Sequence, residues 1–308
     1  MSTPTLQQLY ATHQGKVSDK WAIYLSAYER LFSPYRDKPV RLLEIGIQNG
    51  GSLEIWSQYF EDAQKLVGCD INPQCSVLTY QDSRIGVVVG DANLPENKER
   101  ILALSPQYDI IIDDGSHESH DIVKSFGYYF GNVVDGGLFV AEDLHCSYWQ
   151  PYEGGLFHPH SSIAFFKRLA DITNPEHWGV PKARRDIVQT FASRYGAQFD
   201  EELLTHIHSV EFLNSVCVVR KEAPPANVLG PRVIAGQQEL VVPGQHSHHG
   251  TTCMRLDQRA NPWAAREVSV EEELPVRLHL MAELQQTLAL RDQQIAQLTA
   301  QLAERDDG

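Results

Sequence analysis

Short apolar runs alternate with amphipathic stretches from residue 40 onward. An apolar run without a polar face is typical of a strand buried on both faces of a parallel sheet, whereas a helical period is typical of the helices that cover such a sheet. The predicted strands are 41–46, 65–71, 84–90, 108–113 and 137–142. The predicted helices between them are 51–62, 95–104 and 119–133. This alternation predicts an α/β fold with a Rossmann-like, doubly wound and mostly parallel sheet.

Further elements flank this repeat. Residues 18–33 carry apolar side chains at helical spacing, so we expect a helix there that packs beside the first strand. Another helix is expected at 161–173. Two apolar runs within 206–221 surround a turn at Asn214, which predicts a C-terminal hairpin that gives the sheet an antiparallel edge.

The chain changes character after residue 222. Residues 223–268 are rich in Pro, Gly, Gln and His without a clear period, so we expect an extended linker or arm. The tail returns to a helical pattern with an a/d seam, in which Arg291 occupies one d position. The apolar seam residues are Met281, Leu284, Leu288, Ile295, Leu298 and Leu302. The seam predicts a coiled coil with a second copy or a partner enzyme; the alternative is a helix that lies back on its own domain.

These patterns divide the chain into four segments. We expect a helical N-terminal cap that contributes to substrate binding at 1–39 and a sheet domain at 40–222. The arm at 223–268 and the helical coiled-coil tail at 269–308 complete the division.

The composition narrows the partners and the compartment. The 308 residues include 26 basic and 40 acidic side chains, a formal charge of −14, which disfavours nucleic acid or an anionic membrane surface as the main partner. We see neither an apolar stretch long enough to span a bilayer nor a secretion signal at the N-terminus. The five cysteines are scattered and form no CxxC pair, which favours reduced thiols in a cytoplasmic protein.

Acidic pairs follow two of the predicted strands. Asp113 and Asp114 end one run, and Glu142 and Asp143 end another. Ligands of parallel sheets bind at the carboxyl ends of the strands, so these four carboxylates should gather where chemistry occurs. Carboxylates packed that closely need protons or a cation, and hard oxygen ligands favour Mg²⁺, Ca²⁺ or Mn²⁺.

A nucleotide-like pocket is indicated by the ends of the first three strands. The glycines at 46, 50 and 51 do not match the GxGxxG of dinucleotide enzymes. Their spacing after Glu44 is closer to the first motif of class I S-adenosylmethionine (SAM) methyltransferases. Asp70 ends the second strand, where a carboxylate suits ribose hydroxyls, and Asp91 follows the third, where an acid suits an adenine amino group. The alternative for each acid is a solvated cap.

Specific sequence segments extend this pattern across roughly residues 15–222. They are Asp19-Lys20-Trp21, Leu43-Glu44-Ile45-Gly46-Ile47, Gly50-Gly51-Ser52-Leu53, Trp56, Gly68-Cys69-Asp70-Ile71, Asp113-Asp114-Gly115-Ser116-His117 with His120, Gly136-Gly137-Leu138, and Glu142-Asp143 with Ser147-Tyr148-Trp149. With these segments the chain resembles the metal-dependent sugar O-methyltransferases of macrolide biosynthesis, such as the mycinamicin enzymes, whose relatives are often labelled cephalosporin hydroxylase. It departs from them at Val17-Ser18, where relatives often have Gly-Thr, which puts N-terminal substrate contacts in doubt.

The resemblance implies a SAM- and Mg²⁺-dependent O-methyltransferase acting on a sugar hydroxyl of a glycoconjugate, polysaccharide or glycosylated natural product. It implies that Asp114, Glu142 and Asp143 hold Mg²⁺, with Mn²⁺ or Ca²⁺ as alternatives, and that His117 is the general base. The expected cofactor residues are Glu44, Gly46, Gly50, Ser52, Asp70, Asp91 and Asp113. The residues expected to contact the carbohydrate acceptor are His120, Tyr148 and Trp149. The alternatives are that the two aromatic residues belong to the core and that His117 and His120 are ordinary helix-start residues.

Elementary chemistry supports these roles. An alcohol is a poor nucleophile, but a divalent ion bound to two adjacent hydroxyls lowers the pKa of one of them. A histidine within hydrogen-bond reach can then take the proton, and His120 and His145 compete with His117 for this role. Neighbouring side chains on an extended segment point apart, so Asp113 and Asp114 can serve the cofactor and the metal separately, unless Asp113 caps the following helix.

Two other functions remain as alternatives. The first is an NAD-linked oxidoreductase of the same fold class, against which the missing GxGxxG counts. The second is a non-catalytic scaffold that assembles through its coiled-coil tail, against which the complete set of acids with His117 counts.

Overall fold

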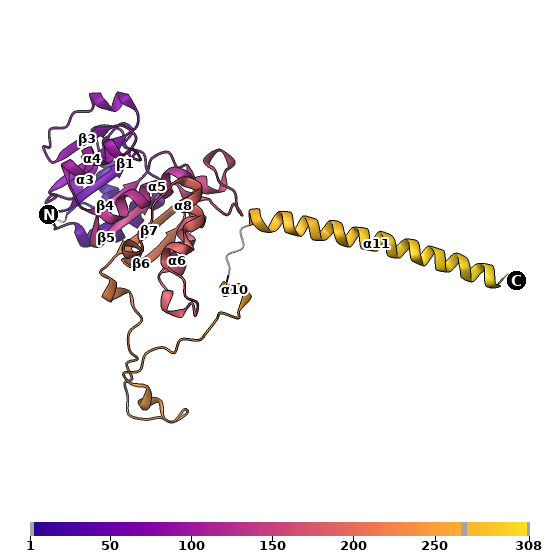
Figure 1. Ribbon diagram of the computed structural model, residues 1–308. Coiled ribbons are helices and arrows are strands. Elements are labelled where there is room, and N and C mark those ends of the chain that lie inside the picture. The colour runs from indigo at the N-terminus through magenta and orange to yellow at the C-terminus, as the bar shows by residue number, and fades with distance from the viewer. Residues whose placement is uncertain (1–2, 266–269, 307–308) are drawn as a thin grey trace. The chain divides into compact units, whose positions relative to one another are not determined.

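The computed structural model describes residues 3–265 and 270–306 (Figure 1). The chain forms two compact units, Met1–Leu256 and Asp257–Gly308. The first unit contains the sheet. The second contains the short helix α10 (Pro262–Ala265) and the long helix α11 (Val270–Asp306).

The first unit is built on a seven-stranded sheet of order β3-β2-β1-β4-β5-β7-β6. The strands are β1 (Arg41–Ile45), β2 (Lys65–Asp70), β3 (Ile85–Val89), β4 (Tyr108–Asp113), β5 (Val133–Ala141), β6 (Ile207–Leu213) and β7 (Val216–Lys221). Strands β1 to β5 pair in parallel, whereas β7 pairs antiparallel with β5 and β6 with β7. The prediction of a Rossmann-like sheet with an antiparallel C-terminal hairpin is confirmed.

The register aligns the carboxyl ends of the central strands. Ile45 of β1 pairs with Asp113 of β4, and Asp113 pairs with Ala141 of β5. The residues that follow these three strands therefore emerge side by side at one edge of the sheet. This alignment brings the two acidic pairs together.

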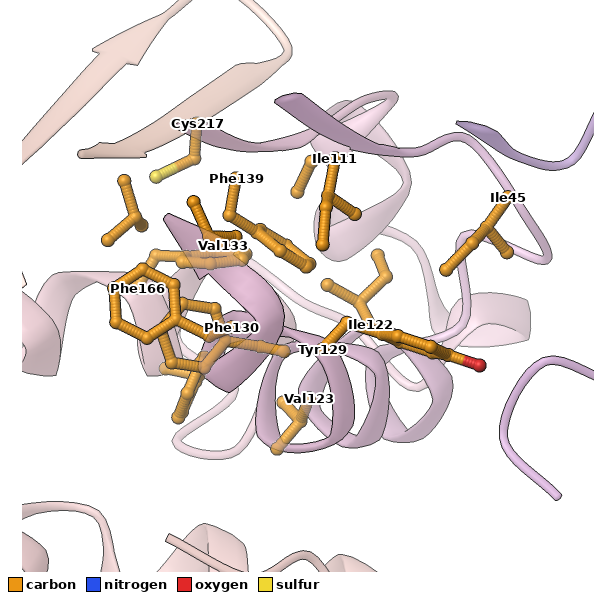
Figure 2. Packing of buried hydrophobic residues seen from close by; sticks show 14 of the residues in the cluster. Ile45, Ile111, Ile122, Val123, Tyr129, Phe130, Val133, Phe139, Phe166 and Cys217 are labelled. Atoms are coloured by element: carbon orange, nitrogen blue, oxygen red, sulfur yellow. The ribbon is translucent and has the colours of Figure 1, made fainter. Parts of the chain in front are cut away.

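Helices cover both faces of the sheet, because successive strand residues point to opposite sides. One apolar cluster joins Leu42, Ile110 and Val140 to helices α1 to α3, and the opposite cluster joins Leu43 and Phe139 to α5, α6 and α8. Figure 2 shows part of the second cluster, with α5 residues packed beneath the sheet. The helices of this unit are α1 (Leu6–Thr12), α2 (Ala22–Phe32), α3 (Gly51–Tyr59), α4 (Pro95–Leu104), α5 (Ser119–Tyr129), α6 (Ser162–Ile172), α7 (Arg184–Ile187), α8 (Gln189–Tyr195) and α9 (Glu201–Leu204).

Several boundaries differ from the sequence-based expectation. The expected helix at 18–33 begins only at Ala22, because the preceding segment lies against α3, where Val17 accepts a hydrogen bond from the Gly51 backbone. Strand β5 begins at Val133, before the expected start at 137, with Gly136 at a φ of 82° inside the strand. Helices α1, α7, α8 and α9 were not predicted; they have seven residues or fewer, too short for a clear period.

The predicted tail coincides with α11. The seam side chains Met281, Leu284, Leu288, Ile295 and Leu298 are exposed, whereas the side chain of Leu302 lies outside the described residues, as do residues 266–269. Whether this seam forms a coiled coil stays a prediction, and so does the four-segment division of the chain. Across 3–265 and 270–306 no helix has the length and apolarity needed to cross a membrane.

Candidate functional site

A cavity of about 480 Å³ opens at the carboxyl ends of β1 to β4. It lies where the doubly wound fold places its ligands. Of the residues expected to bind a cofactor, those that line the cavity are Glu44, Gly46, Ser52, Asp70, Asp91 and Asp113. Gly50 is instead the N-cap of α3, where it has a φ of 78°.

The loop after β1 packs closely against two other backbone segments, the loop after β4 and the N-terminal segment. Gly46 has a φ of 85°, and a Cβ atom there would collide with the carbonyl oxygen of Asp114. A Cβ atom at Gly51 would collide with the carbonyl oxygen of Lys16. These contacts hold the β1 loop against the β4 loop on one side and against the N-terminal segment on the other.

Asp70 and Asp91 face the cavity and also organise their own loops. Asp70 Oδ2 accepts hydrogen bonds from the backbone N–H groups of Ile47 (3.0 Å) and Gln48 (2.8 Å). Asp91 Oδ1 accepts one from Asn93 N–H at 2.8 Å. Both carboxylates therefore cap backbone N–H groups, as the alternative interpretation expected. Both also line the cavity, where a ligand can reach them.

A group suited to a metal ion lies at the edge of the cavity. Asp114, His117 and Asp143 bring one ligand atom each within 4.8 Å of one another, and His117 Nε2 lies 3.6 Å from Asp143 Oδ2. We call these three residues the metal group. His117 and Asp143 have φ values of 61° and 52°, a region that non-glycine residues rarely occupy and that clusters at functional sites. The buried His117 Nδ1 has no hydrogen-bond partner in the described structure.

Helix α2 and the residue before it hold Asp143 in place. Asp143 Oδ1 accepts hydrogen bonds from Tyr24 OH (2.6 Å) and Trp21 Nε1 (3.0 Å), and Asp143 N–H donates to Tyr24 OH. Burial and the neighbouring carboxylate raise the pKa of Tyr24, so its hydroxyl remains a donor. With Oδ1 engaged, Oδ2 is the oxygen that faces His117.

Glu142 lies deeper than the metal group. Its side chain is 1% exposed, and Oε1 accepts hydrogen bonds from Tyr28 OH and from Lys20 Nζ at 2.8 Å. Burial raises the pKa of Glu142 to about 8, although Lys20 opposes this shift. Its expected role as a metal ligand stays a prediction.

Asp113 turns away from Asp114. Asp113 is buried, and its Oδ1 accepts a hydrogen bond from Gly115 N–H at 3.3 Å, whereas its Oδ2 has no partner among the described residues. Asp114 Oδ2 instead faces Lys20. Burial raises the pKa of Asp113 to about 7.

Lys20 is the functional candidate that the sequence analysis missed. Its Nζ lies 2.5 Å from Asp114 Oδ2, 2.8 Å from Glu142 Oε1 and 3.3 Å from Glu44 Oε1. Burial alone would lower the pKa of Lys20, but the three carboxylates hold it well above its ordinary value. The segment Asp19-Lys20-Trp21 carried part of the family resemblance, yet nothing in its spacing placed it beside acids far along the chain.

The expected acceptor-binding residues His120, Tyr148 and Trp149 follow members of the metal group in the chain but are not among the residues that line the cavity. His120 Nδ1 lies 3.0 Å from Glu153 Oε2, and His120 Nε2 lies 3.1 Å from Asp121 Oδ1. Tyr148 and Trp149 are 40% and 50% exposed. They lie on the surface that follows Asp143 in the chain.

His145, the other competitor for the base, also lies beside Asp143, but its Nδ1 is closer to Ser215. Its Nδ1 lies 2.6 Å from Ser215 Oγ and 3.9 Å from Asp143 Oδ1. Its ring packs edge-on between Trp21 and Trp149, with centroid distances of 5.9 and 5.0 Å. These contacts give His145 a packing role that His117 lacks.

The chain is similar to known sugar O-methyltransferases. The chain is 37% identical over 164 residues to the 8-demethyl-8-alpha-L-rhamnosyl tetracenomycin-C 2'-O-methyltransferase of Streptomyces olivaceus, covering 50% of this chain and 42% of that protein. It is 37% identical over 155 residues to the mycinamicin VI 2''-O-methyltransferase of Micromonospora griseorubida, covering 47% of this chain and 38% of that protein. The chain is related to these sugar O-methyltransferases.

A solved structure supports the relationship. MycE methyltransferase from the mycinamycin biosynthetic pathway, in complex with Mg and SAH, superposes with a TM-score of 0.59 at 27% identity, covering 72% of this chain and 56% of that chain. The resemblance stated from the sequence is thus confirmed, although no family model matches the chain. The chain spans less than half the length of the curated relatives it matches.

Proposed function

We propose that this protein is a SAM- and Mg²⁺-dependent O-methyltransferase that acts on a sugar hydroxyl of a glycosylated natural product, glycoconjugate or polysaccharide. The proposal rests on one observation: all three residues of the metal group line the cavity of about 480 Å³. A cofactor bound in the cavity would direct its methyl group toward an acceptor oxygen held at the metal group.

The cavity residues fit a SAM cofactor. Gly46 and Ser52, in the loop and helix start after β1, line the cavity, and Gly50 begins the helix beside them. In this proposal Asp70 binds the ribose hydroxyls, and Asp91 binds the adenine amino group. Asp113 and Glu44 complete the cavity wall.

The metal group fits a divalent cation. Two carboxylates and an imidazole are oxygen and nitrogen donors, and His117 and Asp143 have strained backbone. Asp114 and Asp143 are the expected ligands, with Glu142 as the predicted third. A bound Mg²⁺ supplies Lewis acidity that lowers the pKa of an acceptor hydroxyl. His117 Nε2, which faces the group, takes the proton of that hydroxyl.

The names of the relatives and the exposed aromatic residues after Asp143 both favour a sugar as the acceptor. The relatives are named for methyl transfer to rhamnosyl tetracenomycin-C and to mycinamicin VI. Tyr148 and Trp149 offer exposed aromatic faces on the chain that follows Asp143, and His120 lies three residues beyond His117. We assign these three residues to the sugar-binding surface.

Labelled SAM and a panel of glycosides provide the test. We expect methyl transfer that disappears with EDTA and returns with Mg²⁺. A thermal shift with SAM but not with NAD would reject an oxidoreductase of the same fold. Absence of transfer to every glycoside, together with no shift by SAM, would reject the proposal and favour a non-catalytic scaffold that assembles through α11.

A further inference from the structure

Lys20 lies where the carboxylates of three adjacent strands meet. Glu44 belongs to β1, and Asp114 and Glu142 directly follow β4 and β5, the next two strands in the sheet. The Lys20 side chain is 2% exposed, and its ammonium group lies within 3.3 Å of a carboxylate oxygen of each of the three acids. An ammonium group carries three N–H donors, so a single lysine can serve three carboxylates.

These carboxylates belong to two different halves of the site. On the cofactor side, Glu44 Oε2 accepts hydrogen bonds from Ser52 Oγ (2.6 Å) and Trp56 Nε1 (3.2 Å), both in α3. On the other side, Asp114 is a member of the metal group. The ammonium group of Lys20 therefore joins the cofactor half of the site to the metal half.

The backbone that carries Lys20 is anchored outside the site. Val17 accepts a hydrogen bond from Gly51 N–H at 3.1 Å. Lys16 donates to Glu54 through both its backbone N–H (2.8 Å) and its Nζ (2.6 Å). Because the segment is held on α3, the positive charge of Lys20 is fixed at the carboxylates.

We propose that Lys20 is a positioning residue that holds the two halves of the site together and lowers the affinity of the metal group for divalent cations. This inference rests on the proposed function, which identifies the metal group. A fixed charge in contact with Asp114 repels a cation that binds to the same carboxylate, and it competes for the carboxylate oxygens. Glu142 is engaged by the same ammonium group, so the competition extends to the predicted third ligand.

Mn²⁺ titration of the whole chain, followed by electron paramagnetic resonance, tests the inference without an acceptor. Lys20→Met and Lys20→Gln remove the charge, and we expect each to bind Mn²⁺ about tenfold more tightly than wild type, within the range of ordinary coupling between sites. Lys20→Arg keeps the charge and should keep the weaker affinity. Lys16→Met is the matched control, because it removes the same charge from the same segment but contacts Glu54.

Thermal unfolding gives a second readout. The neutral variants leave buried carboxylates without a counter-ion, so without metal they should unfold at a lower temperature than wild type. Saturating Mn²⁺ should raise that temperature more than it does for wild type. A lysine that merely supported the fold would lower stability without tightening metal binding.

The outcomes separate this inference from the function on which it rests. Unchanged or weaker Mn²⁺ binding in the neutral variants overturns the role of Lys20, while metal-dependent methyl transfer by wild type still stands. If Lys20→Met fails to fold, Lys20→Gln decides, because its amide can still donate to the carboxylates. Wild type that binds no Mn²⁺ would overturn both this role and the metal dependence of the proposed function.

Discussion

At the scale of single residues, two members of the metal group carry backbone strain. His117 and Asp143 are non-glycine residues with positive φ, and such conformations cost roughly 1–3 kcal/mol each unless the surroundings impose them. Tyr24 and Trp21 impose the position of Asp143 through hydrogen bonds. His117 Nε2 lies 3.6 Å from Asp143 Oδ2, so the two strained residues face each other at the edge of the cavity.

His117→Ala should therefore retain cofactor binding and lose turnover. We expect a fall in kcat of roughly 10²–10⁴-fold, the usual contribution of a general base. Isothermal titration with SAH would confirm an intact cavity. His145→Ala is the control, since Ser215 already engages that ring; normal turnover in His117→Ala would assign the base to His120 or His145.

Asp113→Asn should make stability less sensitive to pH. Burial raises the pKa of Asp113 to about 7 in the folded protein, whereas the unfolded value is about 3.9. Between these values the unfolded chain loses its proton first, so the free energy of unfolding falls as pH rises through the window. Asn resembles the protonated acid and avoids this loss.

Urea denaturation in EDTA would measure this difference. We expect equal stabilities of Asp113→Asn and wild type below about pH 4 and an advantage of the variant above about pH 7, by at most about 4 kcal/mol. The exposed Asp62→Asn should follow wild type throughout. A constant difference between Asp113→Asn and wild type across the window would show that Asp113 does not titrate there.

The sequence located most of this site but not its electrostatics. Asp114 and Asp143 were singled out because they follow strands at the same sheet edge, whereas the expected role of His117 came from the family resemblance. The contact of Lys20 with Glu142 was not found, because it spans 122 positions and has no periodic signal. The ammonium group of Lys20 occupies one oxygen of each of three carboxylates. The order of the strands does not predict which oxygens remain available to a metal ion.

At the scale of elements, the turn after β1 sets the spacing between cofactor and metal sides. Gly46→Ala should lower both the free energy of unfolding and SAH affinity, because its Cβ would collide with the Asp114 carbonyl and its φ is 85°. Gly136→Ala is the matched control, since its φ is 82° and the added Cβ meets no atom of the described residues within 4 Å.

Gly136→Ala should cost only the left-handed backbone penalty of about 1–2 kcal/mol and leave SAH binding intact. We expect Gly46→Ala to cost several times as much, as measured by chemical denaturation. Equal costs for the two variants would mean that the β1 loop tolerates the displacement of Asp114.

Element type was predictable wherever the hydrophobic period was long. Strands β1, β2, β4 and β5 each bury a continuous run, and helices α3, α5 and α6 each bury a stripe, so the pattern of the sequence indicated them. The start of α2 was misplaced because residues 13–21 combine apolar side chains with an anchoring role on α3. Hydrogen bonds from this segment to α3 determine where α2 begins, and the pattern of neighbouring residues in the sequence cannot predict such distant contacts.

At the scale of the whole molecule, α11 offers a seam for self-association. Deleting residues 270–308 should reduce the mass in solution by more than the tail itself, because the oligomer would dissociate. Sedimentation velocity measures this change. Leu288→Asp should reproduce it, whereas Leu290→Asp, a similarly exposed leucine off the seam, should not. An identical association state for all four proteins would reject assembly through the tail.

Tyr24 binds two residues, Asp143 and Ser215, that the ribosome adds much later than Tyr24 itself. Tyr24 OH lies 2.9 Å from Ser215 Oγ, a residue 191 positions later in the chain. At about 5–20 residues per second, a ribosome needs roughly 10–40 s to add Ser215 after Tyr24. During that interval the hydroxyl of Tyr24 can bind Asp143 but not Ser215, so the anchoring of α2 is complete only after residue 215 has been added.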